Sequence, residues 1–291
     1  MAIKAREDLR ITDDYVFGDV MNNPEICREL IEAVLGVPID RIEFHHHQHD
    51  VRPTHSARGV RFDVFVKDSN GAAYDVEMQA APQSGFSRRL GYYRSVLDVD
   101  AQSRGVDYEN MKEVVVIFFT KFDLFHAGFK RYDCRTVIEQ TGERLNDGTH
   151  LVILNSKGTK GEVNPIVSSF LEYMEDDKMQ SSSLTRTIDN EINRLRANDD
   201  WYGDYMRYQL YVDEQVAMAR NEAIREGQEI GLAQGREEGL VEGLAEGQAA
   251  TEARYAQLAE KLVELGRGNE LARALTDEAF RSALLAELGL T

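Results

Sequence analysis

The stretch from Arg61 to Gln79 restricts the fold of this chain more than any other segment. It reads RFDVFVKDSNGAAYDVEMQ, so apolar and polar residues alternate on both sides of the segment Asp68-Ser69-Asn70-Gly71. Alternation with a period of two is typical of β-strands, and Asp, Ser, Asn and Gly favour turns. The stretch therefore predicts an antiparallel hairpin of two half-buried strands.

The length of the turn decides which residues of this hairpin face each other. Paired residues of an antiparallel hairpin have numbers with a constant sum, and residues directly opposite each other point to the same face. A two-residue turn at Asn70-Gly71 gives a sum of 141 and mixes apolar with charged residues on each face, which disfavours it. A three-residue loop ending at Gly71 puts glycine where this turn needs a left-handed residue and gives a sum of 140. This second register places Asp63 opposite Glu77.

Two acidic residues then lie side by side on one face of the hairpin, with Asp75 and Gln79 as neighbours on that face. Carboxylates directly opposite each other repel and destabilise a sheet. A divalent cation removes the conflict, and Mg²⁺ is usually held by one or two carboxylates together with water and substrate phosphate. The pattern therefore favours a magnesium site at Asp63 and Glu77, the alternative being a solvated polar face that happens to contain acids. Asp75 is expected either to contact the metal ligands without binding the metal itself, or to be solvated.

The flanking segments predict an α/β fold with a mixed sheet. Two helices are expected in ITDDYVFGDVMNNPEICRELIEAVLG, the first capped by Thr12 or Asp13 and the second ended by Gly36. The helix-period stretch SRRLGYYRSVLDVDAQSR follows the hairpin, and the apolar run EVVVIFFT comes next. This order of helix, strands, helix and buried strand is typical of an α/β core. Strands are expected at Arg41–His46, Val60–Val66, Ala73–Gln79, Glu113–Thr120 and Leu151–Leu154.

The C-terminal part of the chain is strongly polar and has a helical pattern from about Glu175 onward. Six of its glycines recur at every fourth position, and each costs about 0.8–1 kcal/mol relative to alanine inside a helix. Such a stripe either lets a partner backbone approach closely, in a homo-oligomer, or belongs to an exposed, fraying tail. We expect an α/β domain at 1–205 and an acidic helical tail at 206–291. The glycines are Gly227, Gly231, Gly235, Gly239, Gly243 and Gly247.

The net charge of −17 argues at first against a nucleic-acid partner, because Lys and Arg supply most of the affinity for phosphate backbones. The charge is unevenly spread, since Val51 to Arg135 contains 13 Lys and Arg against 11 Asp and Glu. This balance of charges is compatible with a mildly basic cleft near the hairpin. No apolar run reaches the roughly 18 residues of a membrane span, and the start is too polar for a secretory signal, so a cytoplasmic protein without a membrane partner is expected. Cys27 and Cys134 lie outside any metal-binding spacing and are expected to be free thiols.

At these residues the chain resembles a known family. Asp63, followed after the hairpin by Glu77-Met78-Gln79, resembles the Asp…Glu-x-Lys core of the PD-(D/E)XK nuclease superfamily, in the Glu-x-Gln variant of its recombination-promoting nuclease and transposase family. The flanks DDYVFGDVM, SRRLGYYRSVL and EVVVIFFTKFDLF are similar to the family's helix and strand segments, and the glycine-spaced acidic tail is typical of it. The resemblance is close from about Ile11 to Phe125 and looser in the remainder.

The resemblance implies a restriction-endonuclease-like core, with a central mixed β-sheet flanked by helices, followed by the acidic C-terminal helical tail. It implies a magnesium-dependent DNA endonuclease that hydrolyses phosphodiester bonds, accepts Mn²⁺ in place of Mg²⁺, and takes part in DNA recombination or mobile-element transfer. Asp63, Glu77 and Gln79 are then the catalytic residues, and Asp63, Glu77 and the Met78 carbonyl hold the metal. The alternatives are a weak or inactive nuclease-fold scaffold that associates with DNA or protein partners, and a protein-interaction module without a nucleic-acid role.

Gln79 stands where the superfamily usually has Lys. An amide hydrogen-bonds a water molecule but brings no positive charge, so water activation would depend on the metal or on a basic residue from elsewhere. The candidates for that residue are Arg61, Lys67 and Arg89, each of which is otherwise an ordinary surface or phosphate-contacting side chain. Asp14 is expected either to approach the metal from the first helix or simply to start that helix.

Two weaker signals lie on either side of the hairpin. The histidines that precede it could place three imidazoles on one strand face for zinc, but no Cys or carboxylate at ligand spacing completes a tetrahedral site, which favours a polar strand and loop near the substrate. Tyr92, Tyr93 and Phe86 could stack on exposed bases, but their helical spacing beside apolar residues favours core packing. The histidines are His45, His46, His47, His49 and His55.

Overall fold

Two antiparallel strands joined by a tight turn lie at the centre of the computed structural model, which describes residues 3–44, 49–51, 59–102 and 105–290. Strand β4 (Val64–Asp68) pairs with β5 (Ala73–Gln79), with Val64 opposite Val76. The paired residue numbers have a sum of 140 throughout this ladder. Gly71 has a φ of 84°, the left-handed conformation that the three-residue loop requires. The predicted register of the hairpin is therefore confirmed.

The strand expected at Val60–Val66 is interrupted at Asp63. Strand β3 (Val60–Phe62) pairs with β2 (His49–Val51) in a separate two-stranded sheet, whereas β4 belongs to the main sheet. Asp63 forms the bend between β3 and β4. Alternation of apolar and polar residues does not reveal such a bend, because it reports only the face to which each side chain points.

Six strands of the described chain form a mixed sheet in the order β1-β4-β5-β6-β8-β7. Strands β5, β6 and β8 run parallel to one another, and the other neighbours in this sheet are antiparallel. Helix α3 (Phe86–Ala101) connects β5 to β6, which is the crossover that parallel strands need. The expected α/β core with a central mixed sheet is confirmed. The other strands of this sheet are β1 (Ile42–Phe44), β6 (Val114–Thr120), β7 (Arg131–Cys134) and β8 (Thr149–Asn155).

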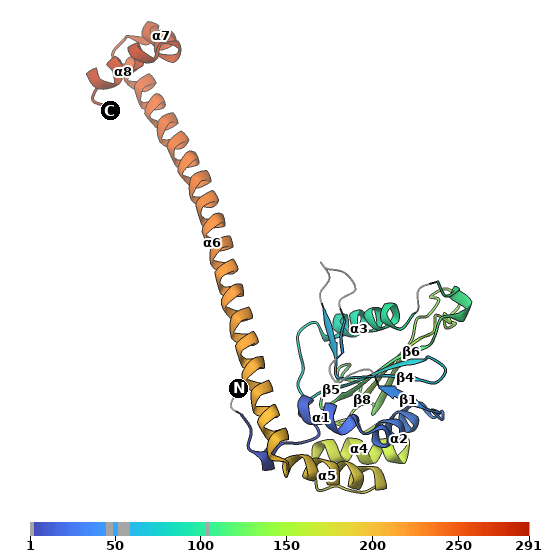
Figure 1. The fold of residues 1–291 in the computed structure, drawn as a ribbon. Helices are drawn as coiled ribbons and strands as arrows, with labels where there is room; N and C mark the ends of the chain where they lie inside the picture. Colours follow the sequence, from blue (N-terminus) through green and yellow to red (C-terminus); the bar gives the residue numbers. More distant parts are fainter. Residues whose placement is uncertain (1–2, 45–48, 52–58, 103–104, 291) are drawn as a thin grey trace. The chain divides into compact units, whose positions relative to one another are not determined.

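Helices cover both faces of the sheet, with α3 on one face and four helices on the other (Figure 1). Asn23 caps helix α2 (Pro24–Leu35) by accepting hydrogen bonds from the amides of Glu25 and Ile26. Gly36 ends this helix with a φ of 72°. The four helices are α1 (Asp14–Met21), α2 (Pro24–Leu35), α4 (Pro165–Glu175) and α5 (Ser183–Arg196), and the short 3-10 helices η1 (Arg6–Asp8) and η2 (Tyr108–Asn110) lie outside them.

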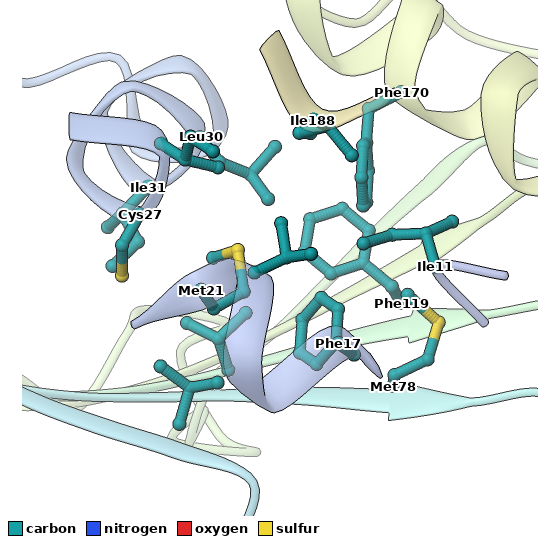
Figure 2. Close-up of a cluster of buried hydrophobic side chains, with 14 of the residues drawn as sticks. Ile11, Phe17, Met21, Cys27, Leu30, Ile31, Met78, Phe119, Phe170 and Ile188 are labelled. Atoms are coloured by element: carbon teal, nitrogen blue, oxygen red, sulfur yellow. The ribbon is translucent and has the colours of Figure 1, made fainter. Parts of the chain in front are cut away.

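Strand β6 is buried on both faces, as its unbroken apolar run predicts. Its odd-numbered residues from Val115 to Phe119 join the larger apolar cluster beneath the four helices, and its even-numbered residues from Val114 to Phe118 join the cluster beneath α3. Figure 2 shows Met78 and Phe119 of the sheet beside Phe17 of α1 in the larger cluster. The sheet is thus packed between helices through an apolar cluster on each face.

The chain divides into two compact units, Met1–Leu210 and Tyr211–Thr291. The polar C-terminal stretch forms the long helix α6, and the second unit has its own small apolar cluster, which includes Leu258, Leu262 and Leu284. No helix in the described part of the chain is long and apolar enough to cross a membrane. The C-terminal elements are α6 (Asp199–Glu264), η3 (Gly268–Glu270), α7 (Leu271–Thr276) and α8 (Glu278–Glu287).

The six glycines spaced by four residues all lie in α6. A Cβ added at any of them would meet no described atom within 4 Å beyond the neighbouring turns of the helix. The chain itself therefore gives no packing reason for the glycine stripe, and self-association through α6 stays a prediction.

Candidate active site

The bend at Asp63 brings two carboxyl groups together on the face of the sheet that α3 covers. The Asp63 amide donates a hydrogen bond to Glu77 Oε1 at 2.9 Å, and the Met78 amide donates to Asp63 Oδ2 at 3.1 Å. Each acid thus accepts a hydrogen bond from the backbone of the segment opposite, one residue beyond the end of the ladder at Val64 and Val76. Asp63 is partly exposed, whereas Glu77 is only 1% exposed. The pair therefore extends from the surface into the protein interior.

Strand β5 carries three polar side chains in a row on this face. Asp75, Glu77 and Gln79 are 0%, 1% and 8% exposed. The expectation of a half-buried strand is therefore wrong for β5, and the alternative of a solvated polar face does not hold for it either, because α3 covers this face. In the described part of the chain, neither Asp75 oxygen has a hydrogen-bond partner. The nearby Glu77 carboxyl can provide one only if one of the two acids is protonated, since two carboxylates have no hydrogen to share.

Burial raises the pKa values of the Asp63, Asp75 and Glu77 carboxyl groups well above their ordinary values. The next cause is the charge of a neighbouring acid, which is Glu77 for Asp63, Asp63 for Asp75, and Asp75 for Glu77. Arg89 opposes the increase at each of them. The three groups are therefore poorly stabilised as anions by the protein alone, which is the electrostatic condition that attracts a cation.

Arg89 of α3 is a basic side chain in direct contact with this acidic row. Its Nη2 donates to Glu77 Oε2 at 3.3 Å, and its Nη1 donates to Gln79 Oε1 at 2.8 Å. The guanidinium also lies over the Tyr93 ring, 4.7 Å from its centroid, and donates to the Tyr93 hydroxyl at 3.0 Å. Gln79 in turn donates to the Ala81 carbonyl at 2.8 Å. Among the three basic candidates from the sequence, Arg89 is the one whose described contacts reach both Glu77 and Gln79.

The other candidates occupy different places. Lys67 lies opposite Ala73 near the turn of the hairpin, with its Nζ 5.5 Å from the centroid of the Phe65 ring. Arg61 is on β3, where its carbonyl accepts a hydrogen bond from the Tyr93 hydroxyl at 3.4 Å. Neither position puts the side chain in a described contact with the acid pair.

Asp14 is the first residue of α1, in agreement with its expected role at a helix start. Its charge is nevertheless close enough to contribute to the raised pKa of Asp63. Protein packed around the Asp14 carboxyl, followed by the charge of Asp13, raises its own pKa, although the residue as a whole is exposed. Asp14 therefore adds negative potential at Asp63.

Among the described residues, no three His, Cys, Asp or Glu side chains form a group that could hold a metal ion. Asp63 and Glu77 thus provide two carboxylates, and further ligands would have to be backbone oxygens, water or substrate. In the histidine cluster, His49 is the first residue of β2. The zinc alternative also requires His45 and His47. These two residues lie outside the described part of the chain, as do His46 and His55. Cys27 and Cys134 are free thiols, as expected.

A cavity of about 560 Å³ opens beside Arg89, which is within the roughly 300–1,000 Å³ typical of ligand pockets. It is bounded by the start of β3, the turn before α3 and the first turns of α3, and its lining includes the exposed Arg88. Tyr92 and Tyr93 both line this cavity and pack, half-buried, against the cluster beneath α3. Phe86 is buried in that cluster, as its helical spacing favoured. A ligand in this cavity would lie against Arg89 and next to the acid pair.

The contact between Arg89 and Tyr93 was not predicted from the sequence. The signal that could have indicated it is their spacing of four residues, which places both side chains on one face of a helix. That face is the one turned toward β5, and Tyr93 therefore fixes the guanidinium against the acids from the helix side.

One comparison with known proteins identifies the family of this chain. Residues 12–198 match a family model described as PD-(D/E)XK nuclease family transposase, a range that runs from just before α1 to just after α5 and includes Asp63, Glu77 and Gln79. Comparison with curated proteins gave no match, and comparison with solved structures gave none either. The family match covers well over half of the chain and the whole main sheet, so the chain belongs to the family of PD-(D/E)XK nuclease transposases.

Proposed function

We propose that this chain is a divalent-metal-dependent DNA endonuclease in which Asp63 and Glu77 hold the metal. The observation that carries the proposal is the cross-strand pair, in which each carboxyl group accepts a hydrogen bond from the backbone of the other strand. As anions the two groups repel each other where little water reaches them, and a cation between them relieves this repulsion. Family membership supports DNA phosphodiesters as the substrate and DNA recombination or transfer of mobile elements as the process.

The donor atoms at this position suit a hard divalent cation such as Mg²⁺ or Mn²⁺. Carboxylate and carbonyl oxygens are the ligands that these ions prefer. Met78 directs its amide toward Asp63, and the amide and carbonyl of one strand residue point to the same side, so the Met78 carbonyl also faces the acid pair. A bound divalent cation would polarise the phosphoryl group and lower the pKa of a coordinated water.

In this proposal Arg89 supplies the positive charge that Gln79 lacks. Gln79 and Gln83 both accept from Arg89 Nη1, at 2.8 and 3.0 Å, and so orient the guanidinium. A guanidinium remains protonated and cannot act as a base, but its fork of N–H groups matches the oxygens of a phosphate. Arg89 would therefore stabilise negative charge that develops on the scissile phosphate, while Gln79 acts by positioning Arg89.

The direct test is cleavage of supercoiled plasmid DNA by purified protein with Mg²⁺ or Mn²⁺. The wild-type chain is expected to nick or linearise the plasmid, and Asp63→Ala and Glu77→Ala are each expected to lose at least about 100-fold in rate. Arg220→Gln, a change at an exposed residue of α6, serves as the matched control and should cleave like the wild type. Equal cleavage by all four proteins, or cleavage that EDTA leaves unchanged, would contradict the assigned site.

A second candidate, a DNA-associated scaffold without activity, is favoured by one observation. Glu77 is 1% exposed and both its oxygens are engaged, Oε1 by the Asp63 amide and Oε2 by Arg89. A carboxylate already neutralised by a guanidinium has less need of a metal. Calorimetric titration with Mn²⁺ separates the two candidates, because the endonuclease proposal requires binding that Glu77→Ala removes, whereas the scaffold requires none.

A further inference from the structure

A second cavity, of about 550 Å³, lies on the opposite face of the main sheet from the acid pair. Its floor contains Tyr74, Val115 and His150, each the second residue of its strand, and Tyr74 and Val115 belong to the larger apolar cluster. Glu77 and Gln79 instead lie toward the other end of β5 and on the other face. The cavity is therefore separate from the candidate active site, and the proposed endonuclease function does not use it.

Three arginines and three acids line this cavity, but most of the acids are already satisfied. Asp133 accepts two hydrogen bonds from Arg131, both at 2.8 Å, and a third at 2.8 Å from His150 Nε2. Asp147 accepts hydrogen bonds from two threonine hydroxyls and from one backbone amide. Both carboxylates thus have little capacity left for another cation. The third acid, Glu113, is exposed.

His150 is held in one neutral form by its two neighbours. Arg135 Nη2 lies 2.9 Å from His150 Nδ1, and because a guanidinium only donates hydrogen bonds, Nδ1 has to accept. The proton of the ring is then on Nε2, which donates to Asp133. Burial is the main cause of a lowered pKa at His150, in keeping with the neutral ring. Arg135 is therefore held by an uncharged group, and its own charge is not cancelled by this contact.

Arg135 and Arg144 have no carboxylate within ion-pair distance among the described residues. Both residues are exposed and line the same cavity, and Arg144 is fixed by a backbone bridge to Val137. Apolar side chains, among them Leu35 and Leu145, form another part of the wall. The cavity thus combines two uncancelled guanidinium groups with an apolar surface.

We propose that this cavity binds a small organic phosphate of the mononucleotide type. The phosphate would be held by Arg135 and Arg144, whose N–H forks match its oxygens, and the nucleoside would lie against the apolar wall and the Tyr74 ring. The volume of about 550 Å³ exceeds what an inorganic anion alone fills and is typical of a pocket for a small organic ligand. Glu113 and Asp147 are the two acids of the lining without a described ion pair, and both would repel the phosphate.

The test is calorimetric titration of the full-length protein, without divalent metal, with dAMP, inorganic phosphate and deoxyadenosine. The wild type is expected to bind dAMP at least about tenfold more tightly than either of the other two probes. Arg144→Gln and Arg135→Gln should each weaken dAMP binding by about tenfold or more, and Glu113→Gln should strengthen it by a few fold. Arg220→Gln, at an exposed residue of α6 that lines neither cavity, should bind dAMP like the wild type.

Three results would overturn the proposal. Equal dAMP binding by wild type, Arg135→Gln and Arg144→Gln would show that the ligand lies elsewhere, and equal binding of deoxyadenosine would show that no phosphate is recognised. Inorganic phosphate binding as tightly as dAMP would exclude the organic part. Arg144→Gln is the decisive variant, because Arg144 is exposed and its described contact is through the backbone, so the fold should not depend on its side chain. Plasmid cleavage is a separate measurement, so its outcome does not affect this one.

Discussion

The two faces of strand β5 come from the same seven residues and have opposite characters. Val76 and Met78 pack into the larger apolar cluster, where burying each such side chain stabilises the fold by about 1.5–3 kcal/mol. Asp75 and Glu77 point the other way and are equally buried beneath α3, where a carboxylate without a full set of partners opposes folding. The apolar face thus stabilises the sheet enough for the acidic face to be held in an unfavourable arrangement. These acids oppose folding, and under the proposed function they serve to bind a cation.

The largest effect is expected on the apolar face. Phe119→Ala removes a fully buried ring that packs against Phe170 at 4.9 Å between centroids, and it should lower the free energy of unfolding by about 3–5 kcal/mol. Urea denaturation measures this change, and Val99→Ala, at a residue 65% exposed, is the control with an expected cost below about 0.5 kcal/mol. A cost below about 1 kcal/mol for Phe119→Ala would contradict the assignment of stability to this face.

The acidic face should respond to metal instead. Mg²⁺ or Mn²⁺ at a concentration of about 100 times its dissociation constant should raise the free energy of unfolding by about 2.7 kcal/mol, because it binds the folded chain and relieves the repulsion of Asp63 and Glu77. Thermal unfolding with and without EDTA measures this difference. Phe119→Ala should gain as much as the wild type, whereas Glu77→Ala should gain nothing. Equal stabilisation of Glu77→Ala would place the metal elsewhere.

The part of the fold that sequence could predict is the part set by local patterns. The register of the hairpin follows from Gly71 and from the need to keep charged and apolar residues on separate faces, and β6 follows from an unbroken apolar run. Strand β7 and helix α4 were not anticipated. Strand β7 is short, polar and at the edge of the sheet, so its pairing with β8 is a tertiary contact that no local period reports.

The candidate site, like the fold, was predictable only where local sequence patterns determine it. Alternation and turn chemistry place Asp63 opposite Glu77, and the hydrogen bonds across the strands agree with that placement. The bend at Asp63, the burial of Asp75 and the choice of Arg89 among the basic candidates all depend on how α3 packs over the sheet. That packing joins segments whose relative position is set by the whole core, and a strand pattern contains no information on it.

Asp75, whose carboxylate oxygens have no hydrogen-bond partner among the described residues, gives a prediction about pH. The folded-state pKa of Asp75 is raised, chiefly by burial, so without metal the folded chain binds more protons than the unfolded chain between the ordinary pKa and the raised one. The contribution of the Asp75 carboxyl to the free energy of unfolding is therefore complete below about pH 4, and it is lost as the pH rises through the raised pKa. Asp75→Asn removes this loss and should increase the free energy of unfolding at pH 7 by about 1–3 kcal/mol, measured by urea denaturation in EDTA.

Urea denaturation at pH 4 as well as at pH 7 provides the control for Asp75→Asn. At pH 4 the wild-type acid is largely protonated in the folded chain, so the variant should differ little from it there. Asp68→Asn, which changes an acid that accepts hydrogen bonds from Asn70, Ala72 and Tyr74, should instead lower stability at pH 7. A wild type that is more stable than Asp75→Asn at pH 7 would mean that Asp75 has a compensating partner.

The smallest effect is expected where the two faces meet in one residue. The side chain of Met78 packs in the larger apolar cluster, whereas its backbone amide bonds to Asp63 on the acidic side. Met78→Leu keeps the volume and the backbone, so it should cost less than about 1.5 kcal/mol of unfolding free energy and leave plasmid cleavage within about twofold of the wild type. Stability and cleavage measured on the same preparation test both halves of this statement. A tenfold loss of cleavage with unchanged stability would mean that the side chain, and not the carbonyl and amide, connects Met78 to the acid pair.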